Sequence, residues 1–223
     1  MKQGVAAKAV VKFISSFVVA ALLLFVPAGT LDYPNGWLFL ALLFTPMALF
    51  GLFLLIKHPL LLARRLEGKE EQGEQKMVAF LGALLFVAGF LSAGLDERYR
   101  WTTVPVWGVA VASIIFLGGY GLFVAVMMQN EYLSRTITVE SAQTVIDTGL
   151  YSIVRHPMYG ASTIMFLAMP LVLGSFVSFV IFLFYPLLMV KRIAGEEEVL
   201  ERELEGYSEY KARVRYRLIP WLW

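Results

Sequence analysis

Residues 157–190 read PMYGASTIMFLAMPLVLGSFVSFVIFLFYPLLMV, a stretch of 34 residues without one charged side chain. A single α-helix of this length would extend about 51 Å, whereas the hydrocarbon core of a bilayer is roughly 30 Å thick. The stretch must therefore break, and Pro170 with Gly174-Ser175 supplies a breakpoint near its middle. We expect a helical hairpin that dips into or barely crosses the membrane and returns. The hairpin would bring residues near 155–159 close to residues near 191–197.

Further apolar runs precede the hairpin, and they predict four transmembrane helices at about 10–31, 36–56, 77–95 and 103–129. The composition agrees, because 59% of the residues are hydrophobic and 16% are charged, which is far more apolar than a soluble domain. A membrane β-barrel would instead alternate apolar and polar residues. The first run could also be a signal peptide, but its continuation to Leu31 and the second span that follows directly favour a retained helix.

After the hairpin, residues 193–205 place Ile193, Leu200 and Leu204 on one side and mostly charged residues around the rest, which predicts an amphipathic helix. Of the 19 Lys and Arg residues, 17 fall on one side if the helices alternate as expected. By the positive-inside rule that side is cytoplasmic, and it includes both termini. The predicted fold class is an all-α polytopic membrane protein with four transmembrane helices, a C-terminal hairpin and a cytoplasmic amphipathic helix.

The densest cluster of candidate functional residues is 151–160, which reads YSIVRHPMYG. Pro157 is suited to the first position of a helix, so the amides of Met158, Tyr159 and Gly160 would be free to bind a carboxylate or phosphate. The same residues would also suit an interfacial anchor made of basic and aromatic side chains. Both readings remain open on the pattern alone.

Two other groups of polar residues could serve a site. Arg192 and Glu196 share one helical face, either as a surface ion pair or as groups that hold a ligand. Gln129-Asn130-Glu131 is either a polar helix end or a set of hydrogen-bonding groups for a cofactor. Arg64-Arg65 indicates first a lipid-headgroup or topology signal, and His58 a structural interfacial residue.

Several functional classes leave no trace in the sequence. The chain has no cysteine, which excludes disulfides and thiolate metal sites. It also lacks HExxH, GxSxG and phosphate-cradling GxxxxGK[ST] motifs, and no glycine-rich GxGxxG follows a strand. We expect no metal site and no nucleic-acid partner.

Over about residues 129–222 the chain resembles the isoprenylcysteine carboxyl methyltransferase family, a membrane group related to phospholipid methyltransferases. The resemblance rests on the order and spacing of five pieces, which are Gln129-Asn130-Glu131, Asp147-Thr148-Gly149-Leu150-Tyr151, Arg155-His156-Pro157-Met158-Tyr159, Arg192 followed by Glu196-Glu197, and Gly206-Tyr207-x-x-Tyr210. It implies a division into N-terminal transmembrane helices (1–128) and a methyltransferase core (129–223).

The resemblance also implies S-adenosylmethionine as cofactor and a lipidic or isoprenoid acceptor in contact with membrane lipids. Arg192 would bind the acceptor carboxylate, and Arg192, Glu196 and His156 would form the catalytic group. The implied cofactor-binding residues are Gln129, Gln143, Thr144, Val145, Ile146, Tyr151, His156, Pro157, Met158, Tyr159 and Glu196.

The acceptor chemistry allows alternatives. A carboxylate is already a nucleophile, so positioning would be the main contribution of the protein. An amine or thiol acceptor on the same scaffold would first lose a proton, which Glu196, Glu197 or His156 could accept. A non-enzymatic membrane protein with an Arg-His-Pro anchor is the third possibility.

Overall fold

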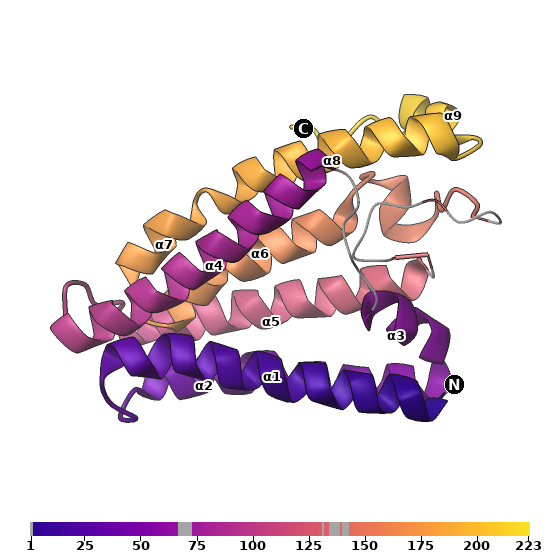
Figure 1. Ribbon diagram of the computed structural model, residues 1–223. Coiled ribbons are helices and arrows are strands. Elements are labelled where there is room, and N and C mark those ends of the chain that lie inside the picture. The colour runs from indigo at the N-terminus through magenta and orange to yellow at the C-terminus, as the bar shows by residue number, and fades with distance from the viewer. Residues whose placement is uncertain (1, 67–72, 131, 134–138, 140–142) are drawn as a thin grey trace.

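The computed structural model describes residues 2–66, 73–130, 132–133, 139 and 143–223, and within them every regular element is helical. The elements in chain order are α1 (Lys2–Ala28), α2 (Pro34–Lys57), α3 (Pro59–Leu66), α4 (Gly73–Tyr99), α5 (Val106–Gln129), the 3-10 turn η1 (Gly149–Ser152), α6 (Pro157–Val172), α7 (Phe176–Phe182), α8 (Tyr185–Glu203) and α9 (Tyr207–Arg213). The long helices run lengthwise through the molecule (Figure 1).

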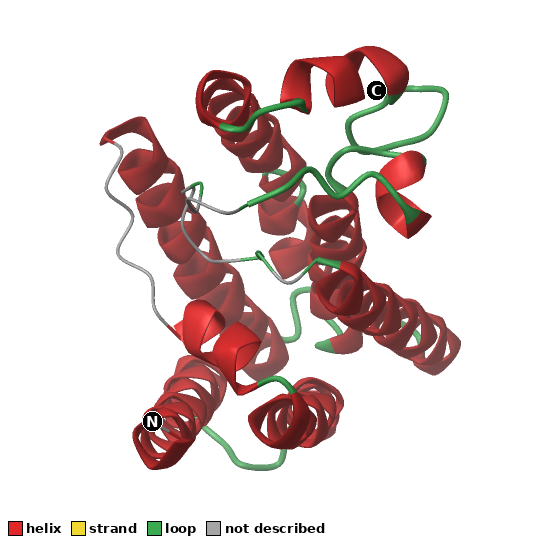
Figure 2. Ribbon diagram, turned by 90° about the vertical axis from the view of Figure 1, so that its right-hand side faces the viewer, coloured by secondary structure: helices red, strands yellow, loops and turns green. Residues whose placement is uncertain are grey.

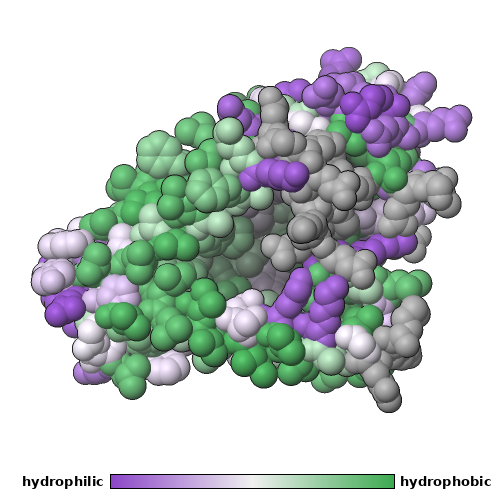
Figure 3. All heavy atoms as spheres, viewed as in Figure 1, coloured by the Kyte–Doolittle hydropathy of each residue, from purple (hydrophilic) through white to green (hydrophobic). Residues whose placement is uncertain are grey.

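Five of the described stretches are long and apolar enough to cross a bilayer, and they comprise α1, α2, α4, α5 and the continuous stretch from α7 into α8. Hydrophobic residues cover the body of the face seen in Figure 3, while hydrophilic residues gather toward its two ends. The predicted all-α polytopic membrane fold is confirmed, and the chain is an integral membrane protein.

The short helix α3 was not expected, because residues 57–76 were interpreted as a polar connection. Most residues of α3 are apolar, and its buried Leu61 and Leu62 pack onto the neighbouring helices α1 and α2. The charged residues that give 57–76 its polar composition lie mostly after residue 66.

The predicted hairpin is confirmed as α6 followed by α7 and α8. The chain breaks at Gly174, whose φ of +82° lies in the left-handed region that favours glycine. Pro170 lies inside the last turns of α6 and does not mark the break. Ser175 then caps α7 by accepting a hydrogen bond from the amide of Ser178 at 3.0 Å.

The hairpin turn reaches the loops at the end of the bundle remote from α3, which we call the opposite end. There Ser175 donates to Asp96 Oδ2 at 2.5 Å, and Asp96 also accepts from the amide of Thr102 at 2.7 Å. Tyr33, beside the α1–α2 turn, donates to the carbonyl of Leu173 at 2.7 Å. The hairpin therefore spans the same depth as the other helices and is not a shallow re-entrant loop.

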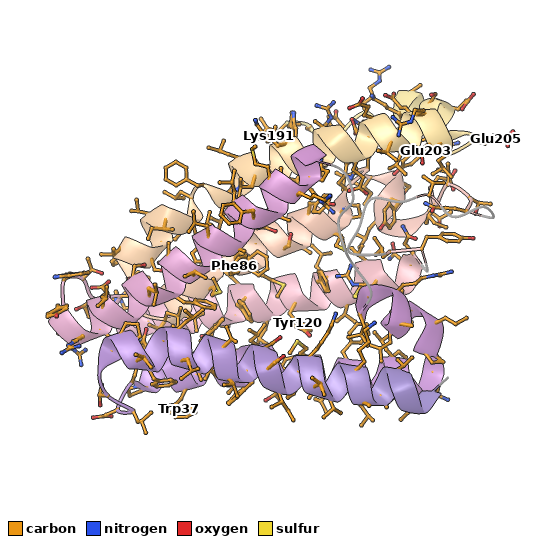
Figure 4. The ribbon with its side chains drawn as sticks, viewed as in Figure 1. Trp37, Phe86, Tyr120, Lys191, Glu203 and Glu205 are labelled. Carbon is orange, nitrogen blue, oxygen red and sulfur yellow. The ribbon has the colours of Figure 1, made fainter. Side chains whose placement is uncertain are left out.

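The second arm of the hairpin continues past the apolar stretch as the amphipathic helix expected at 193–205. Helix α8 is unbroken from Tyr185 to Glu203, with Ile193 fully buried on its inner side. Lys191 projects away from the bundle (Figure 4). Consecutive residues of α8 thus face opposite environments, with Arg192 turned toward the protein interior and Lys191 toward the outside.

Close packing between α5 and α6 ties the two predicted parts of the chain together. Gly119 on α5 permits this approach, because a Cβ there would come within 2.8 Å of Met165 Cγ on α6. Phe39, Phe116 and Phe182 fill the core between the helices. The division at residues 128 and 129 stays a prediction.

Candidate active site

A cavity opens at the end of the bundle where α5 ends and α6 begins, which we call the site end. Figure 2 looks onto this end and shows the helices nearly end-on with the connecting loops lying across them. Counting its open mouth, the cavity measures about 850 Å³, a size suited to a small-molecule ligand. Its lining residues are Asn130, Tyr132, Leu133, Gln143, Thr144, Val145, Ile146, Tyr151, Arg155, His156, Met158, Tyr159, Arg192, Glu196, Leu200, Leu204, Tyr207 and Tyr210.

The convergence expected from the hairpin is present in this cavity. Tyr159, in the first turn of α6, donates to Glu196 Oε2 on α8 at 2.5 Å. Arg192 Nε lies 3.4 Å from the same tyrosine hydroxyl. Tyr159 thus links Arg192 and Glu196, which also share the inner face of α8 as their spacing predicted.

A residue from α4 completes the surroundings of Arg192. The Nη1 group of Arg192 donates to Gln75 Oε1 at 3.0 Å, and Gln75 is only 2% exposed. Gly195 makes room for this side chain, because a Cβ there would lie 2.0 Å from Gln75 Nε2. The N-terminal helices therefore contribute directly to the orientation of the guanidinium.

Glu197 organises the wall beneath the cavity. Its Oε1 accepts from Arg155 Nε at 2.7 Å and lies 3.3 Å from His156 Nε2, while its Oε2 accepts from Arg217 Nε at 3.1 Å. Glu197 and Arg155 are nearly fully buried. Such a buried pair needs hydrogen bonds on all sides, and Arg155 Nη1 supplies more by donating to the carbonyls of Val214 and Arg215 at 2.6 and 2.8 Å.

The C-terminal tail is held against the start of α6 by backbone hydrogen bonds as well. The amides of Arg155 and His156 donate to the carbonyls of Tyr216 and Arg217, both at 2.9 Å. This pairing keeps His156 extended before Pro157, which opens α6 at its first position as expected. The His156 ring then stacks on Tyr159 with a centroid separation of 5.8 Å.

The first backbone amides of α6 were expected to be free to bind an anion, and the structure differs. The amides of Tyr159 and Gly160 both donate to the carbonyl of His156, at 3.1 and 3.3 Å, so they are engaged in the first turn. A tight 3-10-like start satisfies these donors locally. The prediction that all three amides from Met158 to Gly160 are free for an anion is therefore wrong.

The segment before α6 forms another wall, and tyrosines fix its position. Tyr210 donates to the carbonyl of Tyr151 at 2.7 Å, and Asn130 Nδ2 donates to the Tyr151 hydroxyl at 3.2 Å. Gln129 accepts from the amide of Leu150 at 2.9 Å and thereby holds η1 to the end of α5. Glu131, the last member of the Gln129-Asn130-Glu131 group, lies outside the described residues.

Tyr207 presents an unused hydrogen-bonding group at the cavity. Its side chain is 4% exposed, and its hydroxyl has no hydrogen-bond partner within the described part of the chain. Burial raises the pKa of Tyr207 well above the usual range of a phenol, so the group remains a donor. An unpaired buried hydroxyl is costly, which fits a site that is completed by a polar ligand.

Most of the predicted cofactor-binding residues line the cavity, namely Gln143, Thr144, Val145, Ile146, Tyr151, His156, Met158, Tyr159 and Glu196. Gln129 and Pro157 are absent from its lining and support the neighbouring backbone instead. Their direct contact with a cofactor stays a prediction, as do the roles of all these residues.

Sequence reasoning gave no role in the site to Gln75, Arg155 or Tyr207, although Arg155 belongs to the candidate cluster 151–160. Tyr207 and its neighbour Tyr210 stood in the quoted tail motif, and that signal could have placed them here. The pairing of Arg155 with Glu197 and of Arg192 with Gln75 joins segments 42 and 117 residues apart, for which the sequence offers no local signal.

Comparison with known proteins agrees with the resemblance seen in the motifs. Residues 110–202 match the model of the isoprenylcysteine carboxyl methyltransferase (ICMT) family, which confirms the recognition of that family over this segment. A stretch of 91 residues is 32% identical to the Delta(14)-sterol reductase of Mus musculus and covers 40% of this chain. The match spans 22% of that reductase, so the chain corresponds to about a fifth of its length.

Proposed function

We propose that this protein is a membrane-embedded methyltransferase that uses S-adenosylmethionine to O-methylate the carboxylate of a lipidic or isoprenylcysteine-like acceptor. The observation that carries the proposal is the meeting of Arg192, Glu196 and Tyr159 at one cavity. All three lie within the segment that matches the ICMT family.

The cavity offers groups that fit the parts of S-adenosylmethionine. Glu196 can accept hydrogen bonds from an amine or a ribose hydroxyl, and the buried Tyr207 hydroxyl can donate one. Leu200 and Leu204 provide an apolar wall for a flat base. When bound, the cofactor supplies a methyl group on a positively charged sulfur.

Arg192 is the group best placed to hold the acceptor. Its guanidinium can grip a carboxylate with two parallel hydrogen bonds, and Gln75 and Tyr159 orient it from two sides. A carboxylate needs no general base, so the contribution of the protein is to align the carboxylate oxygen with the methyl group. His156 and Glu196 then act by holding the partners in place.

Two other functions make different demands on the same residues. An amine or thiol acceptor would lose a proton, which Glu196 or His156 could accept. The similarity to a sterol reductase raises reduction as a second candidate, and a reductase would require a hydride donor in the cavity. A comparison of S-adenosylhomocysteine binding with NADPH binding therefore separates methyl transfer from reduction.

A transfer assay tests the proposal directly. The purified protein in detergent is incubated with methyl-labelled S-adenosylmethionine and a lipid extract, and the lipid product is treated with base. We expect labelled lipid from which base releases the label, because base hydrolyses a methyl ester. Label that resists base would indicate an amine or thiol acceptor, and binding of NADPH without S-adenosylhomocysteine would favour reduction.

We also propose that the site end faces the cytoplasm, together with both termini. The charge distribution supports this orientation. Because the chain has no cysteine, single-cysteine variants report sidedness cleanly. Exposed Ser152 and Glu198 lie at the site end and exposed Thr103 at the opposite end. In intact cells, an impermeant thiol reagent should label Thr103→Cys alone, and labelling of Ser152→Cys or Glu198→Cys would reverse the orientation.

A further inference from the structure

A second cavity lies between α1, α2 and α3, outside the segment that matches the ICMT family. Counted with its open mouth, it measures about 1090 Å³. Its walls are almost entirely apolar and come from Ala9 and Phe13 on α1, Met47 and Gly51 on α2, and Leu62 on α3. Such a groove in a membrane protein suits a hydrocarbon chain.

Positive charge gathers where this groove meets α3. Lys12 and Arg65 both line it, and Lys12 Nζ donates to the carbonyl of Leu66 at the end of α3. A cation at the lipid boundary is costly and is usually retained for an anionic partner. The groove therefore combines an apolar channel with a basic end, which matches an amphiphile that carries an anionic head.

Arg65 connects the groove with the candidate active site. Its guanidinium lies 5.5 Å from the ring centroid of Phe123 on α5, and its Nη1 lies 3.8 Å from Met158 Sδ. Met158 in turn lines the candidate active-site cavity. An anionic head held at Arg65 would thus lie beside the cavity that contains Arg192 and Glu196.

We propose that the apolar chain of the methyl acceptor occupies the groove between α1, α2 and α3, and that Arg65 guides its carboxylate toward the active site. This inference rests on the proposed function and names the place of its substrate. The occupant is the acceptor, because the basic end of the groove borders Met158. A phospholipid of the surrounding bilayer does not react and so does not have to bind beside the candidate active site.

Glycine positions provide a matched pair of variants. Gly51 lines the groove, and a Cβ built on it meets no atom within 4 Å, so Gly51→Trp fills the groove without a backbone clash. Gly118 on α5 is exposed and equally free of neighbours within 4 Å, but it does not line the groove. Gly118→Trp is therefore the control. Ala9→Leu offers a smaller obstruction from α1.

The measurement has a binding arm and a turnover arm. A photoreactive isoprenyl thioether acid is cross-linked to the purified full-length protein, and the modified peptides are mapped. The KM for the unmodified acid and the affinity for S-adenosylhomocysteine are measured in parallel. We expect cross-links on α1 or α2 in the wild type, their loss in Gly51→Trp, and at least a tenfold rise in KM. Gly118→Trp should behave as the wild type, and Arg65→Gln should raise KM about tenfold, while S-adenosylhomocysteine affinity stays within about twofold in every variant.

Unchanged cross-linking and KM in both Gly51→Trp and Ala9→Leu would overturn the inference and leave the proposed function standing. Displacement of the probe by phosphatidylglycerol but not by the unmodified acid would assign the groove to a bilayer lipid, which also overturns it. Absence of methyl transfer in the wild type would contradict the proposed function, whereas the cross-linking arm would still decide where the acid binds.

Discussion

Replacement of Gln75 by leucine should impair turnover, although Gln75 lies on α4 and far outside the motif-bearing segment. Gln75 is 2% exposed and accepts a hydrogen bond from Arg192 Nη1 at 3.0 Å. Leucine has a similar size but no acceptor. The contact from Arg192 Nε to the Tyr159 hydroxyl is longer, at 3.4 Å, and therefore weaker than the bond to Gln75.

The size of the effect follows from the lost bond. A hydrogen bond to a charged group is worth about 1.5–3 kcal/mol. If Arg192 aligns the acceptor only when held by Gln75, that loss appears in the barrier, where each 1.36 kcal/mol corresponds to roughly tenfold. We therefore expect kcat to fall by about 10- to 100-fold in Gln75→Leu. Gln75→Glu keeps an acceptor for Arg192 and should retain most of the activity.

The assay compares initial rates of methyl transfer with calorimetric titration of S-adenosylhomocysteine in the same preparations. Cofactor affinity should remain within about twofold, because Gln75 does not line the candidate active-site cavity. Normal turnover in a folded Gln75→Leu variant would refute the positioning role. Loss of cofactor binding together with turnover would instead make Gln75 part of the cofactor site or of its stability.

Three further substitutions test separate parts of the site. Arg192→Lys keeps the charge but loses the planar guanidinium that can make two parallel hydrogen bonds. Turnover should therefore fall by tenfold or more, about 1.4 kcal/mol in the barrier, while cofactor affinity stays nearly unchanged. The control Lys191→Ala, on the outer face of α8, should have normal rates. Glu197→Gln breaks a buried charge cluster, so the free energy of unfolding should fall by about 3–5 kcal/mol. The exposed control Glu198→Gln should change it by less than about 0.5 kcal/mol. Equal denaturation midpoints for the two variants would contradict the stabilising role of Glu197. Tyr207→Phe removes a hydroxyl that has no hydrogen-bond partner among the residues that the structure describes. S-adenosylhomocysteine affinity should therefore fall by about fivefold to tenfold, with no loss of stability in the ligand-free protein. A variant with full affinity would remove Tyr207 from the cofactor site.

Much of the fold could be predicted because the deciding signals are local. The length of each apolar run determines the spans, and the excess length of residues 157–190 requires a break. Gly174 supplies that break through a backbone conformation that other residues rarely adopt. Once the hairpin is accepted, the meeting of Tyr159 with Glu196 follows from the geometry of two antiparallel helices.

The unpredicted features depend on tertiary contacts. Helix α3 was not predicted because the charged residues that follow it gave the whole stretch 57–76 a polar composition. The contact between Gln75 and Arg192 depends on how α4 packs beside α8. The spacing of apolar residues along the sequence does not predict which helices pack together. The amides of Tyr159 and Gly160 donate hydrogen bonds within a tight first turn of α6. Pro157 predicted where the helix begins but not the tightness of that turn.

The central claim is that the cavity at the site end binds S-adenosylmethionine, and calorimetric titration of S-adenosylhomocysteine into the purified protein tests it most directly. Wild type should show saturable binding at one site per chain. Glu196→Ala should weaken it by about tenfold, because the variant removes a hydrogen-bonding carboxylate from a partly enclosed cavity. Glu198→Ala, two residues further along α8 and exposed, should bind as the wild type does. Absence of binding to the wild type, or equal affinity in wild type and Glu196→Ala, would contradict the assignment of this cavity.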